Sequence, residues 1–172
     1  VGAGLPLNPE SAPPETLAAE ALVESDHPKI KKQAARILRG SEDTVTAARR
    51  ISEWVNSYLR QTLVPGAPSA LQTLETREGD CNEHSALFAA LARASGVPTR
   101  IAIGLVYRDG RFGYHAWNEV LTADGWLAID VTWQQFPADV GHLRFISGGL
   151  GKQIELLRVV GQLEARDARV TE

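Results

Sequence analysis

The sequence predicts an α+β domain in which several helices come first and an antiparallel sheet follows. Before Gly96, apolar residues recur at the spacing of helix faces. After Gly96, the pattern changes to β-branched and aromatic stretches separated by Asp-Gly turns. Because helical and strand patterns are segregated along the chain, an α+β fold is favoured over an alternating α/β fold. The 172 residues suffice for one such domain with a single core.

Three segments are expected along the chain. Residues 1–14 hold four prolines among small residues, which is typical of a linker or of an arm lying on the domain. The domain itself is expected at 15–163, and the charged residues 164–172 are expected to form a C-terminal tail. The chain begins with Val1 and contains no Met, so we expect it to be an excised domain or a mature fragment.

Helix signals fill the first half of the domain. A short helix is expected over 15–25, and Asp26 is the expected N-cap of a second helix that ends at Gly40. Ser41 is the expected N-cap of a third helix, because apolar residues over 45–59 keep helical spacing.

A loop and a further helix complete the helical half. Residues 62–78 contain two prolines and a glycine within four positions, so they are expected to form a loop. The loop leads into an Ala- and Leu-rich helix that begins at Cys81 and ends before Gly96.

Strand signals fill the second half, where Asp109-Gly110 and Asp124-Gly125 predict hairpin turns. Two further strands are expected on either side of the Gly148-Gly149-Leu150-Gly151 turn. The expected strands cover residues 99–108, 112–121, 126–131, 142–147 and 152–160.

Composition limits the function classes. Hydrophobic residues make up 44% and charged residues 23% of the chain, as in average globular proteins. A net charge of −3 gives no electrostatic footprint for nucleic acid. No apolar stretch approaches the roughly 20 residues that cross a bilayer, so this segment is not expected to span a membrane. One cysteine allows no intrachain disulfide and does not identify the cellular compartment.

Cys81 is the strongest candidate for a catalytic residue. It lies in the segment Gly-Asp-Cys-Asn-Glu-His at 79–84, where a turn opens directly into a buried helix. The unpaired N–H groups and the positive dipole end of a helix N-terminus favour a thiolate. His115 and Asp130 follow downstream, and a cysteine, a histidine and an aspartate are the parts of a nucleophilic triad.

The second hairpin links His115 to Asp130. If Asp124-Gly125 form a two-residue turn, His115 is opposite Gln134. A four-residue turn from Thr122 to Gly125 instead places His115 opposite Thr132, with Asp130 its diagonal neighbour at roughly 7–8 Å. The triad requires this second register. A slip by one residue would put His115 and Asp130 on opposite faces.

These residues imply acyl-transfer chemistry. The Cys81 thiolate would attack an acyl carbon, while His115 accepts the thiol proton and then protonates the leaving amine. Asp130 would hold the imidazole tautomer. The Cys81 N–H is a natural oxyanion donor, and Gln72 is our candidate for the second donor. Trp117 shares the strand face of His115, so it is a candidate for contact with substrate.

Other interpretations of these residues remain open. A lone cysteine is often a small buried hydrophobe, and a histidine or an aspartate on a strand is often structural. A zinc site of Cys81, His84, His115 and Asp130 is conceivable, but the usual short paired-ligand spacing is absent. We therefore predict no metal ligand and no cofactor. His84 is expected to be structural, and His27 and His142 are expected to be ordinary.

Three sequence blocks strongly resemble the transglutaminase-like superfamily. They are the segment at 79–84, Tyr-His-Ala-Trp-Asn-Glu-Val at 114–120 and Gly-Trp-Leu-Ala-Ile-Asp at 125–130, within a similarity over about 40–135. The resemblance implies a papain-like core in which the cysteine helix packs on an antiparallel sheet carrying His and Asp. The chain departs from the usual pattern at Val131, where the family commonly has Pro, and at Asn118, where an aliphatic residue is more common.

The resemblance also implies an activity. Members from microbes are mostly thought to cleave peptide-like bonds, so a cysteine protease or amidase acting on a protein or peptide is expected. Protein-glutamine transglutaminase activity and an inactive peptide-binding module are the alternatives. By family habit, the parent is expected to be a bacterial protein, exported or periplasmic. The sequence leaves the oligomeric state open.

Overall fold

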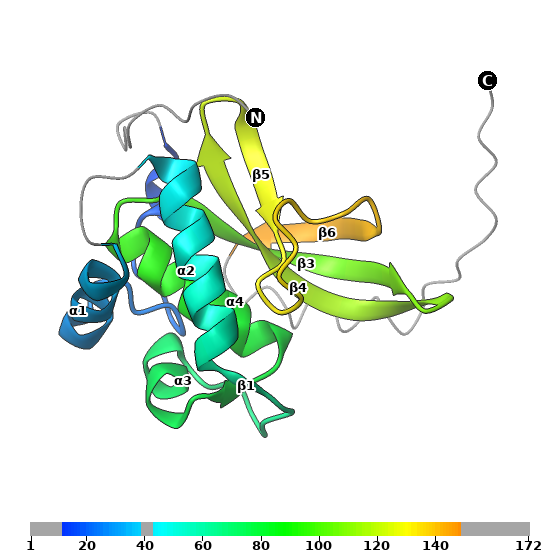
Figure 1. Cartoon of the computed structure of the whole chain (residues 1–172), viewed down its shortest axis with the longest axis horizontal. Helices are drawn as coiled ribbons and strands as arrows, with labels where there is room; N and C mark the ends of the chain where they lie inside the picture. The colour runs from blue at the N-terminus through cyan, green and yellow to red at the C-terminus, as the bar shows by residue number, and fades with distance from the viewer. Residues whose placement is uncertain (1–11, 39–42, 149–172) are drawn as a thin grey trace.

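The computed structural model describes residues 12–38 and 43–148, with a group of helices on one side and a sheet on the other (Figure 1). This arrangement confirms the predicted α+β class. The helices are α1 (Pro28–Ile37), α2 (Thr44–Tyr58), α3 (Ala70–Thr76) and α4 (Cys81–Ala94), with a 3-10 turn at Pro14–Thr16. The strands are β1 (Arg60–Gln61), β2 (Glu78–Gly79), β3 (Thr99–Arg108), β4 (Arg111–Thr122), β5 (Gly125–Ile129) and β6 (His142–Gly148).

Helix α4 is the centre of the core. Every residue from Ala86 to Ala92 is fully buried, because α1, α2 and α3 cover one side of this helix and β3 and β4 cover the other. A helix that is apolar all round is stable only when it is enclosed in this way. The N-terminal end of α4 is thereby fixed against the sheet, and Cys81 is its first residue.

The predicted starts of two helices were wrong by one or two residues. His27, rather than Asp26, is the N-cap of α1, since its Nδ1 accepts the Lys29 N–H at 3.2 Å. Asp43 is the N-cap of α2 and accepts the N–H groups of two residues in the first turn, whereas the predicted cap, Ser41, lies outside the described residues. Several nearby polar residues can cap a helix, so their spacing does not settle which one does.

Two segments differ from the sequence prediction. The helix expected over 15–25 is absent, because the chain there makes a 3-10 turn and a tight β-bridge between Glu20 and Val23. The loop expected over 62–78 contains α3 and the first residue of β2. Helix α3 is short, and a reciprocal capping box between Ser69 and Gln72 stabilises its start.

The main sheet has the order β5-β4-β3-β6, and its pairs are antiparallel. Asp109-Gly110 forms the predicted tight turn, with both residues at positive φ (52° and 80°). In the second hairpin Thr122 pairs with Gly125, which is the four-residue turn that the triad requires. The predicted strand at 152–160 and the tail lie outside the described residues, so the domain limits stay predictions.

Strand β6 runs along β3 with a register shift next to Gly104. A Cβ at this position would lie 2.0 Å from the Leu143 carbonyl oxygen, so a side chain cannot be accommodated without moving β6. His142, the first residue of β6, lies opposite Val106 of β3 in this pairing. Within the described ranges, no helix is long and apolar enough to cross a lipid bilayer.

Candidate active site

Cys81 opens α4 and is partly buried. Asp80 is the N-cap, and Glu83 completes a capping box by accepting the Asp80 N–H at 2.9 Å. Burial raises the pKa of the Cys81 thiol to about 12, and the charges of Asp80 and Glu83 act in the same direction. A hydrogen bond from the Ala116 N–H to the sulfur opposes this rise. The resting site therefore favours the protonated thiol, and not the thiolate expected from the helix dipole.

The thiol lies at a free edge of β4. Leu121 donates its N–H to Pro98 on the β3 side, so Ala116 points its N–H to the opposite edge. Strand β5 ends at Ile129, which pairs with Asn118, so β4 has no β5 partner at Ala116. Cys81 occupies this position and accepts the vacant N–H. Strand β4, which carries His115, therefore also contacts the thiol of Cys81.

Two side chains of β4 also hold the first turns of α4. The Tyr114 hydroxyl donates to the Asn82 Oδ1 at 3.1 Å, and the buried Asn118 amide donates to the Ser85 carbonyl at 3.1 Å. This second bond gives Asn118, a departure from the usual family pattern, a structural reason. Both bonds fix the distance between the start of α4 and the strand that carries His115.

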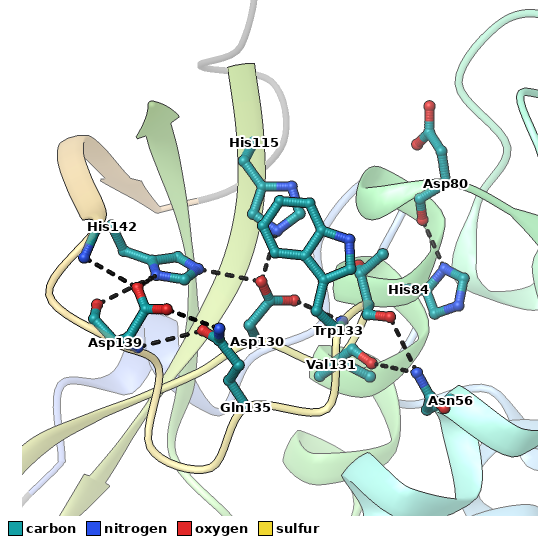
Figure 2. Close-up of polar contacts among 12 residues, drawn as sticks. Asn56, Asp80, His84, His115, Asp130, Val131, Trp133, Gln135, Asp139 and His142 are labelled. Atoms are coloured by element: carbon teal, nitrogen blue, oxygen red, sulfur yellow. Dashed lines mark hydrogen bonds and ion pairs between the residues drawn. The ribbon is translucent and has the colours of Figure 1, made fainter. Parts of the chain in front are cut away.

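His115 and Asp130 make direct contact, as Figure 2 shows. The His115 Nε2 lies 2.8 Å from the Asp130 Oδ2, and their side chains are 3% and 0% exposed. With Nε2 directed at Asp130, Nδ1 is the ring nitrogen that can take a proton from a thiol. The Trp133 indole stacks on the His115 ring at 4.1 Å with an interplanar angle of 7°. The imidazole is therefore fixed in both position and tilt.

Three donors surround the Asp130 carboxylate (Figure 2). His115 and His142 share its Oδ2, and the backbone N–H of Trp133 donates to its Oδ1 at 3.1 Å. Burial by itself would raise the pKa of Asp130, but these hydrogen bonds hold the pKa well below its ordinary value. Asp130 is consequently ionised at neutral pH.

His142 was expected to be ordinary, and this expectation was wrong. Its Nε2 lies 3.0 Å from the Asp130 Oδ2, and its Nδ1 lies 3.1 Å from the Asp139 Oδ1. This contact is hard to predict from the sequence, because it depends on β6 pairing with β3, which lies more than 30 residues earlier in the chain. A histidine at the start of a strand with the same face as His115 is the only pattern that could have drawn attention to it.

The segment after β5 is held by α2. The Asn56 amide donates to the carbonyls of Val131 and Thr132 at 2.9 and 3.0 Å (Figure 2). Val131, which replaces the common Pro of the family, is 1% exposed and packs in the core. These contacts fix the backbone on which Asp130 and Trp133 are carried.

Of the two remaining candidates, Gln72 lies in α3, whereas Trp117 lies on β4 with its ring stacked on that of His115 at 6.3 Å. The Gln72 Oε1 accepts the Ser69 N–H at 2.9 Å within the α3 capping box, so an oxyanion role for its amide nitrogen stays a prediction. Trp117 is 1% exposed and meets the His142 ring edge-on, with centroids 5.1 Å apart. That burial favours packing behind the histidines over contact with substrate.

The structure does not assemble the zinc site considered for Cys81 and His84. The His84 Nδ1 lies 2.6 Å from the Asp80 carbonyl oxygen, and burial lowers the pKa of this histidine. Donor atoms of His115, Asp130 and His142 do lie within 4.8 Å of one another. A metal needs a nitrogen lone pair from each histidine, whereas both His142 nitrogens face oxygen acceptors. We interpret these three residues as a hydrogen-bonded network.

Solved structures share this fold at low sequence identity. A candidate cysteine protease from Cytophaga hutchinsonii matches with a TM-score of 0.68 and 23% identity, over 77% of this chain and 45% of that protein. The periplasmic domain of TgpA from Pseudomonas aeruginosa matches with a TM-score of 0.56 and 23% identity, over 74% of this chain and 50% of that domain.

A curated relative and a family model give the relationship. A protein-glutamine gamma-glutamyltransferase of Pseudomonas aeruginosa is 33% identical over an alignment of 76 positions, and the match covers 37% of this chain. The chain spans only 11% of that relative's length. The model of the transglutaminase-like superfamily matches residues 31–131, more than half of the chain, and this range includes Cys81, His115 and Asp130. The chain therefore belongs to the transglutaminase-like superfamily, as its three sequence blocks predict.

Proposed function

We propose that this domain is a thiol-dependent acyl-transfer enzyme that cleaves peptide or amide bonds with Cys81, His115 and Asp130. The observation that carries the proposal is the buried 2.8 Å contact between His115 and Asp130, with the thiol hydrogen-bonded to the next residue, Ala116. In this proposal the nucleophile, the base and the residue that orients the base come from three adjoining parts of the fold, namely α4, β4 and the segment after β5. The family relationship supports an enzyme of the cysteine protease or transglutaminase type.

The raised pKa of Cys81 defines how the first step proceeds. As the sulfur attacks the acyl carbon, the His115 Nδ1 removes the thiol proton, so no free thiolate is needed beforehand. The Cys81 N–H, at the start of α4, faces the developing oxyanion, and one such donor typically contributes roughly 3–4 kcal/mol. Breakage of the C–N bond follows, and His115 returns the proton to the leaving amine.

The thioester then accepts a second nucleophile. In hydrolysis, water attacks the acyl carbon while His115 takes a water proton, and the proton passes to the departing Cys81 sulfur. In amine transfer, a Lys side chain replaces the water. Hydrolysis is our first choice, because water needs no binding site of its own. The gamma-glutamyltransferase activity for which the Pseudomonas aeruginosa relative is named favours amine transfer as the second candidate.

The test separates these outcomes. The protein is incubated with a peptide library and with glutaminyl peptides, with and without a primary amine, and the products are followed by mass spectrometry. We expect cleavage or deamidation that is lost in Cys81→Ala and His115→Gln. The control His27→Gln, which changes the N-cap of α1 and none of the three proposed catalytic residues, should retain the activity. Products that contain the added amine would favour transglutaminase activity. Peptide binding without any covalent change would refute the enzyme proposal and favour a binding module.

We also propose an exported location for the parent protein. The similar TgpA structure is a periplasmic domain, which supports this assignment. Fractionation of the cells that produce the protein, with detection by an antibody, would test it, and recovery only in the cytoplasm would contradict it.

A further inference from the structure

His142 lies beside the proposed triad, and both of its ring nitrogens face oxygen atoms. Nε2 is 3.0 Å from the Asp130 Oδ2, while Nδ1 is 3.1 Å from the Asp139 Oδ1 and 3.2 Å from the Asp139 carbonyl oxygen. A neutral imidazole has one donor nitrogen and one acceptor nitrogen, so one lone pair would point at a carboxylate. An imidazolium donates from both nitrogens and satisfies all three acceptors.

The surroundings of His142 contain more negative than positive partners. Its side chain is 3% exposed, and besides Asp130 and Asp139 the titratable group near it is His115 on β4, with ring centroids 5.9 Å apart. The nearby cations are engaged elsewhere, Arg144 with Glu119 and Arg108 over the Trp133 ring. Burial by itself would lower the pKa of His142, but the bonds to Asp130 and Asp139 raise the pKa above its ordinary value.

We propose that His142 is a positioning residue, held as an imidazolium that neutralises Asp130 and thereby keeps His115 available as a neutral base. This inference rests on the proposed function of His115, but the charge state of His142 can be measured without any turnover. Because one oxygen of Asp130 serves both rings, its negative charge is already balanced when His142 is protonated. His115 then gains less from taking up a second proton, and its Nδ1 stays free for the thiol proton.

The charge of His142 predicts the effects of two substitutions. Asp139→Asn removes one of the two carboxylates and keeps an acceptor oxygen, so His142 should lose its proton at a lower pH than in the unsubstituted protein. His142→Gln keeps a donor for Asp130 but removes the cation. The His115 nitrogen signals should then respond to pH differently from those of the unsubstituted protein, since the cation whose ring centroid lies 5.9 Å away has gone.

The experiment is an NMR titration of the imidazole nitrogens from pH 4.5 to 9, in the whole chain and in its Cys81→Ala form. We expect both His142 nitrogens to be protonated at pH 7, and the two substitutions to move His142 and His115 as stated. His27, the partly buried N-cap of α1, makes no contact with Asp130 and serves as an internal reference whose signals should not differ between the variants.

A His142 ring with an unprotonated nitrogen at pH 7 in the unsubstituted protein would overturn the proposal. So would a His115 titration that does not move in His142→Gln, provided that thermal unfolding shows the variant to be folded. Because the Cys81→Ala form cannot perform the reaction, these results are independent of whether the enzyme proposal holds. If the unsubstituted protein shows no turnover but the histidines titrate as expected, only the enzyme proposal is contradicted.

Discussion

Glu83→Gln should stabilise the protein at alkaline pH while leaving its stability at acidic pH nearly unchanged. Glu83 is 3% exposed in the first turn of α4, and its Oε2 accepts the Asp80 N–H at 2.9 Å. Burial raises the pKa of Glu83 to about 7, and a hydrogen bond with the Asp80 side chain acts in the same direction. Gln has the same shape and keeps an oxygen for the Asp80 N–H, but it never has to ionise.

The magnitude follows from linkage between protonation and folding. The folded protein retains the Glu83 proton up to about pH 7, whereas the unfolded chain releases it near 4.5. The folded state therefore binds more protons in this window, and the free energy of unfolding falls as the pH rises through it. The full difference corresponds to about 3 kcal/mol above pH 7. Glu83→Gln removes this loss. The difference in free energy of unfolding between the variant and the unsubstituted protein should therefore grow from near zero at pH 4.5 as the pH rises.

Urea denaturation at pH 5 and pH 8 measures this difference. Glu53→Gln, an exposed position on α2, is the matched control and should show little difference from the parent at either pH. A stability difference between Glu83→Gln and the parent that is the same at both pH values would refute the reasoning. The charge of Glu83 also raises the pKa of Cys81, so the variant should react faster with iodoacetamide at pH 8.

Three further predictions follow from the packing around the site. Gly104→Ala should destabilise the protein by about 1–3 kcal/mol because its Cβ meets the Leu143 carbonyl, whereas Gly113→Ala, with no atom within 4 Å, should stay within about 0.5 kcal/mol in the same thermal unfolding assay. Asn56→Ala should cost about 1–2 kcal/mol in urea denaturation, since it leaves two carbonyls unpaired, and an unchanged midpoint would contradict this role. Cys81 should be alkylated slowly at pH 7 and progressively faster up to pH 11, because its pKa is about 12, and rapid labelling at pH 6 would contradict the protonated resting thiol.

Local signals made the main parts of this fold predictable from the sequence. Asp109-Gly110 requires positive φ at two adjacent residues, a property that few dipeptides have, and this fixes the first hairpin. The period of two in strands restricts Asp130 to the face of His115 once the second turn is assigned, and the pair Thr122 and Gly125 has the required register. These rules depend on neighbours in the chain, so they need no knowledge of tertiary structure.

Non-local pairing explains what the sequence could not show. The place of β6 next to β3 is decided by packing across more than 30 residues, and without it His142 has no reason to meet Asp130. Helix α3 was missed for a different reason, since its seven residues follow a stretch rich in Pro and Gly that indicates a loop. In that case a capping box, visible as Ser69 and Gln72, was the stronger signal.

The charge state of Cys81 is a question of magnitudes. A helix dipole contributes typically 0.3–1 kcal/mol to a favourable charge, whereas the rise in pKa from 9.0 to about 12 corresponds to about 4 kcal/mol against the thiolate. Asp80 and Glu83 contribute to that rise, although as capping residues they also stabilise the helix start. The same capping that makes the cysteine helix recognisable therefore offsets its dipole. A protonated thiol in this position needs a nearby base. The proposed chemistry therefore depends on His115 and on the Asp130 carboxylate that His115 shares with His142.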